Sequence, residues 1–287
     1  MLSNVNWRTF NGLVNDWLII ITFVALALCT DLIALYFIAG LVMATRQHAL
    51  LMLFHYGVHG LVAGNRRLND MVINAFVGVP LLIPVHVYRA IHISHHKYVG
   101  TLKDPERLLL YWGQPWNYKP LKSASLLLQF LGDVSGFNSL VMMIRYMMMK
   151  RSDSEIDQPA TRFNLDLLLI FAVFVCGIVI SLNLWPHDTV VILLLWYLPY
   201  LTFTQMLQKV RSFAEHSLDK HNSYTFNWRP GLFGRLTIWP YNINYHREHH
   251  AHPNVPWDQL PSFADTGSVR PGRELITHIW TGSSKWT

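Results

Sequence analysis

Eight histidines of this 287-residue chain gather in three short clusters. The clusters are His55 and His59 (HxxxH), His92, His95 and His96 (HxxHH), and His246, His249 and His250 (a second HxxHH). Imidazoles that are three or four residues apart lie on one face of a helix. Three such faces brought together would form a pocket lined with nitrogen atoms. The number of candidate ligands predicts a site for more than one metal ion.

The HxxxH cluster differs from the zinc-binding helix of proteases. That helix, HExxH, carries a glutamate directly after the first histidine as the general base, whereas Tyr56 stands at this position here. A single catalytic zinc needs only three protein ligands, so eight or nine imidazoles fit two metal ions better. Cys29 and Cys176 lie in apolar stretches and are not expected to bind metal. Imidazole binds iron, copper, zinc and nickel, so the ligand type leaves the metal open.

Four apolar helices are expected to position these clusters. The chain is 52% hydrophobic and only 14% charged, whereas a soluble domain is about 25% charged. Residues 17–44 and 163–208 contain no Lys or Arg, and each stretch is long enough for two crossings of about 20 residues. Breaks at Asp31 and near Pro186 then predict two helical hairpins. The predicted transmembrane helices cover about residues 14–30, 32–54, 163–185 and 189–210.

The basic residues predict the orientation of the chain. All 23 Lys and Arg lie outside the two apolar stretches, so the positive-inside rule places both termini and residues 46–162 in the cytoplasm. All three clusters then lie on one side, in a histidine-rich helical cap of residues 55–162 and 211–287. We predict one all-α, multi-pass integral membrane domain over residues 1–287 with a cytoplasmic active site. The net charge of +6 is attributed to membrane lipid headgroups, and no nucleic acid partner is expected.

A further apolar segment, residues 71–90, is interrupted by Pro80 and Pro84. One full crossing here would put His59 and His92 on opposite sides of the membrane, and the segment is too short for two crossings. We therefore expect it to dip into the membrane interface or to pack as a buried or re-entrant element.

This arrangement resembles the membrane fatty-acid desaturase and hydroxylase superfamily, the histidine-box di-iron membrane oxidoreductases, which includes alkane hydroxylases and carotenoid ketolases. The resemblance extends over residues 17–261. It includes the Lys103-Asp104-Pro105 run, the VRSFAEH segment that ends at His216, and the HREHHAHPNVPWDQLP segment. It implies a four-helix membrane domain under a cytosolic cap that holds two non-haem Fe ions. With O2 as co-substrate, the superfamily oxidises unactivated C–H bonds.

The resemblance also implies a ligand set. By position in the three histidine boxes, and by the histidine upstream of the last box, the ligands are His55, His59, His92, His95, His96, His216, His246, His249 and His250. Asn242 resembles a family asparagine that assists the site, and we expect it on the same helix face as His246. The alternative role is a simple helix cap. Tyr56 departs from the pattern, because many relatives carry Asp or Glu there, and this leaves the substrate class open. The other six histidines are not expected to bind metal, namely His48, His86, His187, His221, His252 and His278.

Four more residues are candidates to support the ligands. Metal-bound imidazoles usually donate their second N–H group to an acceptor, and the candidate acceptors are Asp104, Glu215 and Glu248. Arg211 is spaced for an i,i+4 ion pair with Glu215. That spacing is compatible both with an ordinary salt bridge and with a role in the site.

The expected function is di-iron, O2-dependent oxidation of a lipid-like substrate, with fatty acyl desaturation favoured by the superfamily's base rate. Hydroxylation or monooxygenation of a fatty acid, alkane or carotenoid stays open, because the outcome depends on small differences in where the C–H bond lies. Electrons would come from an external donor of the ferredoxin, rubredoxin or cytochrome type.

The alternative from another class is a non-catalytic membrane protein that carries metal or haem. A transporter should place polar ligands within its membrane helices, whereas the apolar stretches of this chain are nearly free of ionisable residues. Haem needs two axial ligands rather than nine.

Overall fold

The computed structural model describes residues 5–101, 103–106, 123–148, 164–216, 225–265 and 269–275. These residues form helices joined by turns, together with one pair of three-residue strands. The chain divides into two compact units. The first unit contains Met1–Arg89 and Gln158–Tyr200, and the second contains Ala90–Asp157 and Leu201–Thr287.

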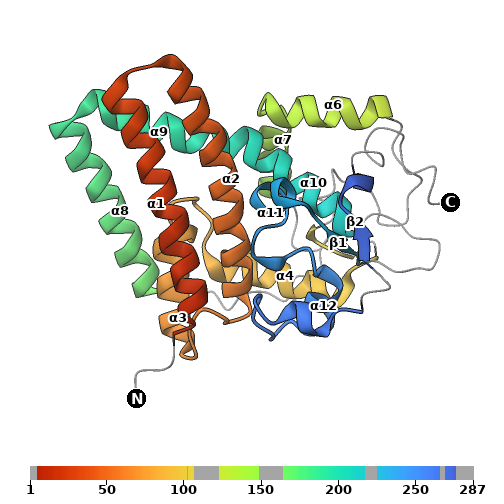
Figure 1. Ribbon diagram of the computed structural model, residues 1–287. Helices are drawn as coiled ribbons and strands as arrows, with labels where there is room; N and C mark the ends of the chain where they lie inside the picture. Colours follow the sequence, from red (N-terminus) through yellow and green to blue (C-terminus); the bar gives the residue numbers. More distant parts are fainter. Residues whose placement is uncertain are drawn as a thin grey trace. The chain divides into compact units, whose positions relative to one another are not determined.

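Four apolar helices build most of the first unit (Figure 1). They are α1 (Trp7–Thr30), α2 (Ile33–Val58), α8 (Leu165–Leu184) and α9 (Pro186–Pro199). Helix α2 packs against both α1 and α9, and α8 packs against α9. The protein is therefore mainly helical, as the sequence predicts.

The ends of these helices follow from local backbone chemistry. Asn6 accepts hydrogen bonds from the first turn of α1, and Asn164 does the same for α8. Helix α1 ends because Asp31 adopts a left-handed conformation with φ of 51°, and its N–H group donates to the Ala27 carbonyl. Pro186 opens α9, a position where the missing N–H group has no cost. The predicted breaks at Asp31 and near Pro186 are confirmed.

Among the residues that the structure describes, four helices are long and apolar enough to cross a membrane. They are Trp7–Thr30, Ile33–Val58, Leu165–Leu184 and Pro186–His216. The last one combines α9, the π-helix η2 (Tyr200–Thr204) and α10 (Gln205–His216). Helix α2 continues beyond the predicted membrane span of residues 32–54 to Val58, so His55 lies inside it and His59 is its C-cap.

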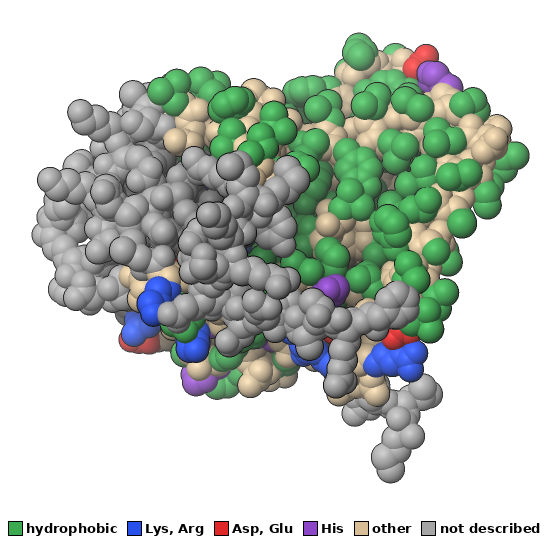
Figure 2. Space-filling model, turned by 180° about the vertical axis from the view of Figure 1, so that it is seen from behind, with side chains coloured by type: hydrophobic (Ala, Val, Ile, Leu, Met, Phe, Trp, Pro, Cys, Tyr) green, Lys and Arg blue, Asp and Glu red, His purple; other side chains and the backbone are tan. Residues whose placement is uncertain are grey.

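The face of the first unit that Figure 2 shows on the right is mostly apolar and is drawn in green. No residue of α8 is buried, and Ile33 and Val173 are 85% and 73% exposed. An exposed apolar surface of this extent suits contact with lipid rather than with water.

Trp196 holds several parts of the first unit together. Its ring stacks on Trp17 with a centroid distance of 5.1 Å. Its carbonyl accepts a hydrogen bond of 2.7 Å from Gln47, and its indole N–H donates to the Pro80 carbonyl at 2.8 Å. These contacts connect α9 to α1, to α2 and to the segment around Pro80.

That segment turns back on itself. It consists of α3 (Arg66–Ile73), the π-helix η1 (Asn74–Gly78), a turn, and α4 (Val85–Tyr98). Leu82 in the turn has φ of 59°, and the Asn74 side chain accepts a hydrogen bond from the Val85 N–H group at 2.9 Å. Residues 71–90 therefore do not form one straight crossing, which agrees with the expectation drawn from Pro80 and Pro84.

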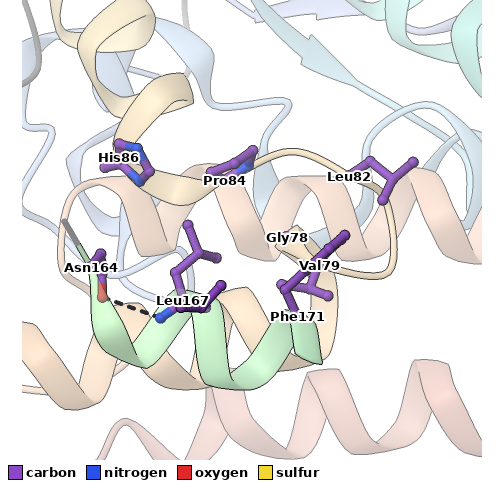
Figure 3. A pocket seen from close by; sticks show the side chains of 9 residues that line it. Gly78, Val79, Leu82, Pro84, His86, Asn164, Leu167 and Phe171 are labelled. Carbon is purple, nitrogen blue, oxygen red and sulfur yellow. Dashed lines mark hydrogen bonds between the residues drawn. The ribbon is translucent and has the colours of Figure 1, made fainter. Parts of the chain in front are cut away.

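A groove of about 450 Å³ lies between this segment and the first turns of α8 (Figure 3). It is lined by Gly78, Val79, Leu82, Pro84, His86, Asn164, Leu167, Leu168 and Phe171. His86 and Asn164, the polar lining side chains, lie at the same end of the groove. The rest of its wall is apolar.

In the second unit, two helices meet at a sharp bend. They are α6 (Ser123–Val134) and α7 (Phe137–Met148), and the described parts of the pair are bent by 85°. Gly136 lies at the bend with φ of 78°, a conformation that favours glycine. Asp133, fully buried, accepts a hydrogen bond of 2.5 Å from Lys209. This ion pair fixes the bend to α10.

The rest of the second unit is built around a short strand pair that the sequence analysis did not predict. Strand β1 (Asn227–Arg229) pairs in parallel with β2 (Val269–Pro271). The helical elements after β1 are α11 (Leu232–Thr237), η3 (Pro240–Asn242), α12 (His246–Ala251) and η4 (Leu260–Phe263).

Candidate metal centre

The second histidine box lies at the end of α4, in the second unit. His92 and His95 are buried. The Nδ1 atom of His92 lies 2.8 Å from Glu106 Oε1, and the Nδ1 atom of His95 lies 2.9 Å from Asp104. A carboxylate at Nδ1 holds the proton on that nitrogen and leaves Nε2 to bind a metal.

The third box begins with the first residue of α12, and His216 is the last residue of α10. Trp228 of β1 brings these two helix ends together. Its indole N–H donates to the Ala214 carbonyl at 3.0 Å, and its backbone exchanges two hydrogen bonds with Asn244, of 2.9 and 2.8 Å. The histidine that lies upstream of the last box in the sequence is thus adjacent to that box in space.

Four histidines of the second unit form one group. They are His95, His216, His246 and His250, and their candidate ligand atoms all lie within 4.8 Å of one another. The Nε2 atom of His246 lies 2.9 Å from that of His216 and 3.0 Å from that of His250. Two nitrogens bound to the same metal ion at about 2.1 Å lie about 3 Å apart. The group therefore fits one metal ion.

A second group in the same unit contains His92, His96 and His249. The Nε2 atom of His96 lies 3.0 Å from that of His92 and 3.1 Å from that of His249. These distances again match nitrogens that share one ion. The two groups use alternating residues of both HxxHH boxes, because neighbouring histidines in each box point to different groups.

The first box belongs to the first unit. His55 is buried, and its ring lies 5.7 Å from that of His59 between centroids. Burial lowers the pKa of His59 to about 4, and Arg66 and Arg89 contribute to this shift. His59 is therefore neutral at pH 7, as a metal-binding imidazole must be.

Comparison with known proteins decides the family. A sequence model described as "Fatty acid desaturase" matches residues 31–273. The chain belongs to this family. It is therefore an oxidoreductase, and its family and the four apolar helices among the described residues indicate a membrane protein.

Two relatives show the range of this similarity. The chain is 28% identical to "Dihydrorhizobitoxine desaturase" of Bradyrhizobium elkanii over 261 residues, which cover 86% of this chain and 72% of the relative. It is 24% identical to "Putative sphingolipid delta(4)-desaturase/C4-monooxygenase" of Caenorhabditis elegans over 256 residues. That match covers 86% of this chain and 58% of the relative.

Burial and neighbouring charges shift the pKa of three imidazoles in the two groups. Burial lowers the pKa of His246 and of His250 well below the usual value, and the surrounding histidines lower it further. Burial would also lower the pKa of His95, but Glu106 and Asp104 raise it above its usual value. Of these two carboxylates, Asp104 is the one that contacts Nδ1 of His95.

The predicted supporting residues have different outcomes. Asp104 contacts His95 as described, and the expected ion pair of Arg211 with Glu215 is present. Glu215 also lies 3.2 Å from His246 Nδ1. Glu248 is buried, and its Oε2 atom accepts no hydrogen bond from the residues that the structure describes. Sequence reasoning missed Glu106, although the Asp-Pro-Glu run after the second box places it two residues beyond Asp104.

The prediction for Asn242 is wrong in its geometry. Helix α12 begins only at His246, and Asn242 has φ of 54°, so the two residues do not share a helix face. The Asn242 side chain instead donates to the Trp257 carbonyl at 3.1 Å. Its described contact stabilises the turn before the third box.

The described histidines outside the boxes lie in other surroundings. His48 is buried within α2, His86 lines the groove of Figure 3, and exposed His187 lies 3.1 Å from Asp188. The His252 ring lies 5.0 Å from that of Phe263. Neither histidine group includes any of them, and His221 and His278 lie outside the described residues.

Proposed function

We propose that this desaturase uses two iron ions and O2 to introduce a double bond into a lipid-like chain. The observation that carries the proposal is the pair of histidine groups in the second unit, each with Nε2 atoms about 3 Å apart. Two groups of this kind fit two ions. The carboxylates at Nδ1 of His92 and His95 fix which nitrogen faces each ion.

The full ligand set extends the two groups to nine histidines. One ion would be held by His95, His216, His246 and His250. The other would be held by His92, His96 and His249 together with His55 and His59, which resemble the first histidine box of the family. The neutral state of His59 supports this assignment.

When bound, the two irons supply the O2 chemistry that removes hydrogen from unactivated C–H bonds. In desaturation, two neighbouring carbons each lose one hydrogen atom and a C=C bond forms. O2 takes up these two hydrogens together with two electrons and two protons, and leaves as two molecules of water. The electrons require an external donor, for which we propose a ferredoxin, rubredoxin or cytochrome. The described residues of this chain orient the imidazoles and surround them with protein.

Hydroxylation is the second candidate. The C. elegans relative is named both as a desaturase and as a C4-monooxygenase. The name of one similar protein therefore includes both desaturation and monooxygenation. The B. elkanii relative is named for dihydrorhizobitoxine, so the name of a relative does not fix the substrate of this chain. We further propose a multi-pass protein whose termini and metal site lie in the cytoplasm.

Mass spectrometry of lipids tests the proposal. Cells that express the chain with an electron donor should contain a product that is two hydrogens lighter than its precursor, and His95→Ala should abolish it. A product that is one oxygen heavier would replace desaturation with hydroxylation. The purified protein should contain two irons per chain. Zinc alone, from cells grown with ample iron, would overturn the proposal.

A further inference from the structure

The groove of Figure 3 belongs entirely to the first unit. His86 and Asn164 lie at one end of it, and Leu82 and Phe171 lie at the other. None of the nine described residues that line it is a Lys, Arg, Asp or Glu. Its volume of about 450 Å³ lies within the range of about 300–1,000 Å³ that is usual for small-molecule sites. The groove is therefore an apolar site with polar groups at one end.

The polar end of the groove lies where α8 begins. Asn164 is the N-cap of α8, and Phe171 lies about 10 Å further along the helix axis. Asp166, two residues after Asn164, pairs with Arg67, whose side chain is 74% exposed. An exposed ion pair of this kind belongs in water or among lipid headgroups, whereas α8 itself is a candidate membrane span. The groove therefore runs from the end of a membrane span toward its interior.

His86 supplies an uncharged donor at the polar end. Its Nδ1 atom is buried and has no hydrogen-bond partner among the described residues. A buried N–H group without an acceptor is costly, so we expect the proton on Nε2. Burial lowers the pKa of His86 and Arg89 lowers it further, against a smaller opposite effect of Asp70. The ring is therefore neutral at pH 7, and its Nε2–H group is the donor that it offers.

Asn164 supplies a second neutral donor. Its side-chain oxygen accepts a hydrogen bond of 3.2 Å from the Leu167 N–H group, which leaves its NH2 group as a donor. Two neutral donors suit an uncharged carbonyl oxygen. A carboxylate or phosphate would instead favour a cation as its partner, and no Lys or Arg is among the described residues that line the groove.

The rest of the groove opens toward the surface that lipid would cover. Leu82, Leu168 and Phe171 line it and are all exposed, and no residue of α8 is buried. An exposed apolar surface on a membrane span is covered by hydrocarbon rather than by water. The occupant that the bilayer supplies at this position is therefore an acyl chain.

We propose that the groove holds one acyl chain of a bilayer phospholipid, whose ester carbonyl accepts hydrogen bonds from His86 and Asn164. A phospholipid carries its esters at the membrane interface and its chains in the interior, which is the direction in which the groove changes from polar to apolar. The lipid fills the space between α8 and the segment around Pro80. His86 belongs to neither histidine group, so the proposal does not depend on the metal ions.

Leu168→Trp places a larger side chain in the groove and tests the site of the acyl chain. The matched control is Leu169→Trp, because Leu169 is the next residue of α8, is also exposed and does not line the groove. Native mass spectrometry of the purified protein in detergent measures the binding of added phosphatidylcholine with two oleoyl chains. Oleic acid is titrated in a separate series.

We expect one phosphatidylcholine to bind the wild type saturably. Leu168→Trp should weaken this binding about tenfold or more, because the excluded chain loses its buried contacts, and Leu169→Trp should change it by less than about twofold. Equal binding by the two folded variants would overturn the inference. Oleic acid that binds more tightly than the phospholipid, and that alone responds to Leu168→Trp, would also overturn it.

His86→Phe tests the polar end, because it keeps an aromatic ring and removes the N–H donor. The affinity for phosphatidylcholine should fall by about two- to tenfold, as expected for one hydrogen bond. Cross-linking of the wild type covers the case in which Leu168→Trp does not fold. A phosphatidylcholine with a diazirine on one chain, in nanodiscs, should label residues 78–84 and the first two turns of α8. Labelling that leaves out both segments would contradict the proposed site.

Discussion

Arg89 and Asp70 are joined by two hydrogen bonds, of 3.0 and 2.6 Å, that connect α4 to α3. The Arg89 Nε atom also donates to the carbonyl of Val58, the last residue of α2, at 2.9 Å. The Arg89 guanidinium therefore fixes the C-terminal end of α2, which carries His55, to helices α3 and α4. The position of the first histidine box depends on this contact.

Replacing Arg89 with Ala should destabilise the protein by about 2–3 kcal/mol, because Asp70 and the Val58 carbonyl lose charge-assisted hydrogen bonds. Unfolding in detergent, followed by circular dichroism, measures the effect. The control is Arg67→Ala, which removes the bidentate contact with Asp166. The Arg67 side chain is 74% exposed, so this change should cost less than about 1 kcal/mol. Equal losses in both variants would contradict this view of Arg89.

His250→Ala should remove one iron per chain and abolish product formation, because its Nε2 atom belongs to the four-histidine group. His252→Ala is a matched change two residues away, on an exposed side chain. It should leave iron content and activity within about twofold of the wild type. Elemental analysis measures the iron content of the two variants, and a product assay measures their activity. Loss of iron in His252→Ala would contradict the proposed ligand set.

Removing the metal should lower the thermal stability of the protein. A ligand that binds only the folded state stabilises it by about 2.7 kcal/mol at a hundred times its Kd, and the grouped imidazoles are arranged only in the folded chain. Treatment with a strong chelator should therefore lower the melting temperature. The same treatment should have a smaller effect on His250→Ala. An equal shift in both proteins would mean that the chelator acts elsewhere.

Lys209→Met should destabilise the second unit by about 3–5 kcal/mol, since Asp133 would keep a buried charge without its cation. The double variant Lys209→Met/Asp133→Leu removes both charges and should recover most of this loss. Asn138 still has the Gln129 carbonyl as an acceptor at 2.9 Å in that variant. Thermal unfolding of the wild type and both variants tests the coupling. A double variant that is less stable than Lys209→Met would contradict the prediction.

Hydropathy and helical periodicity were sufficient to predict the apolar helices and the histidine boxes. Asp31 and Pro186 mark the helix breaks because a left-handed cap and a ring-locked residue are local effects. The alternation of His92, His95 and His96 between two groups also follows from helix geometry. Such features need no knowledge of the rest of the chain.

Contacts between distant segments could not be predicted in this way. The role of Trp228 depends on a strand paired with residues about 40 positions later, and short strands carry almost no sequence signal. Glu106 lies beyond the end of α4, where no period relates it to His92. Extending the helix of the third box by one turn would put Asn242 on the face of His246, but the backbone at Tyr241 and Asn242 is left-handed and stops that extension.

Helix α8 and the end of helix α2 should accept substitutions at different rates during evolution. Helix α8 has no buried residue, so mutation can exchange its Leu, Ile, Val and Phe side chains freely as long as the helix stays apolar. The last 12 residues of α2, from Gln47 to Val58, are all buried, so each must keep its size and shape. Among descendants of this sequence, α8 should diverge early and the end of α2 should diverge late.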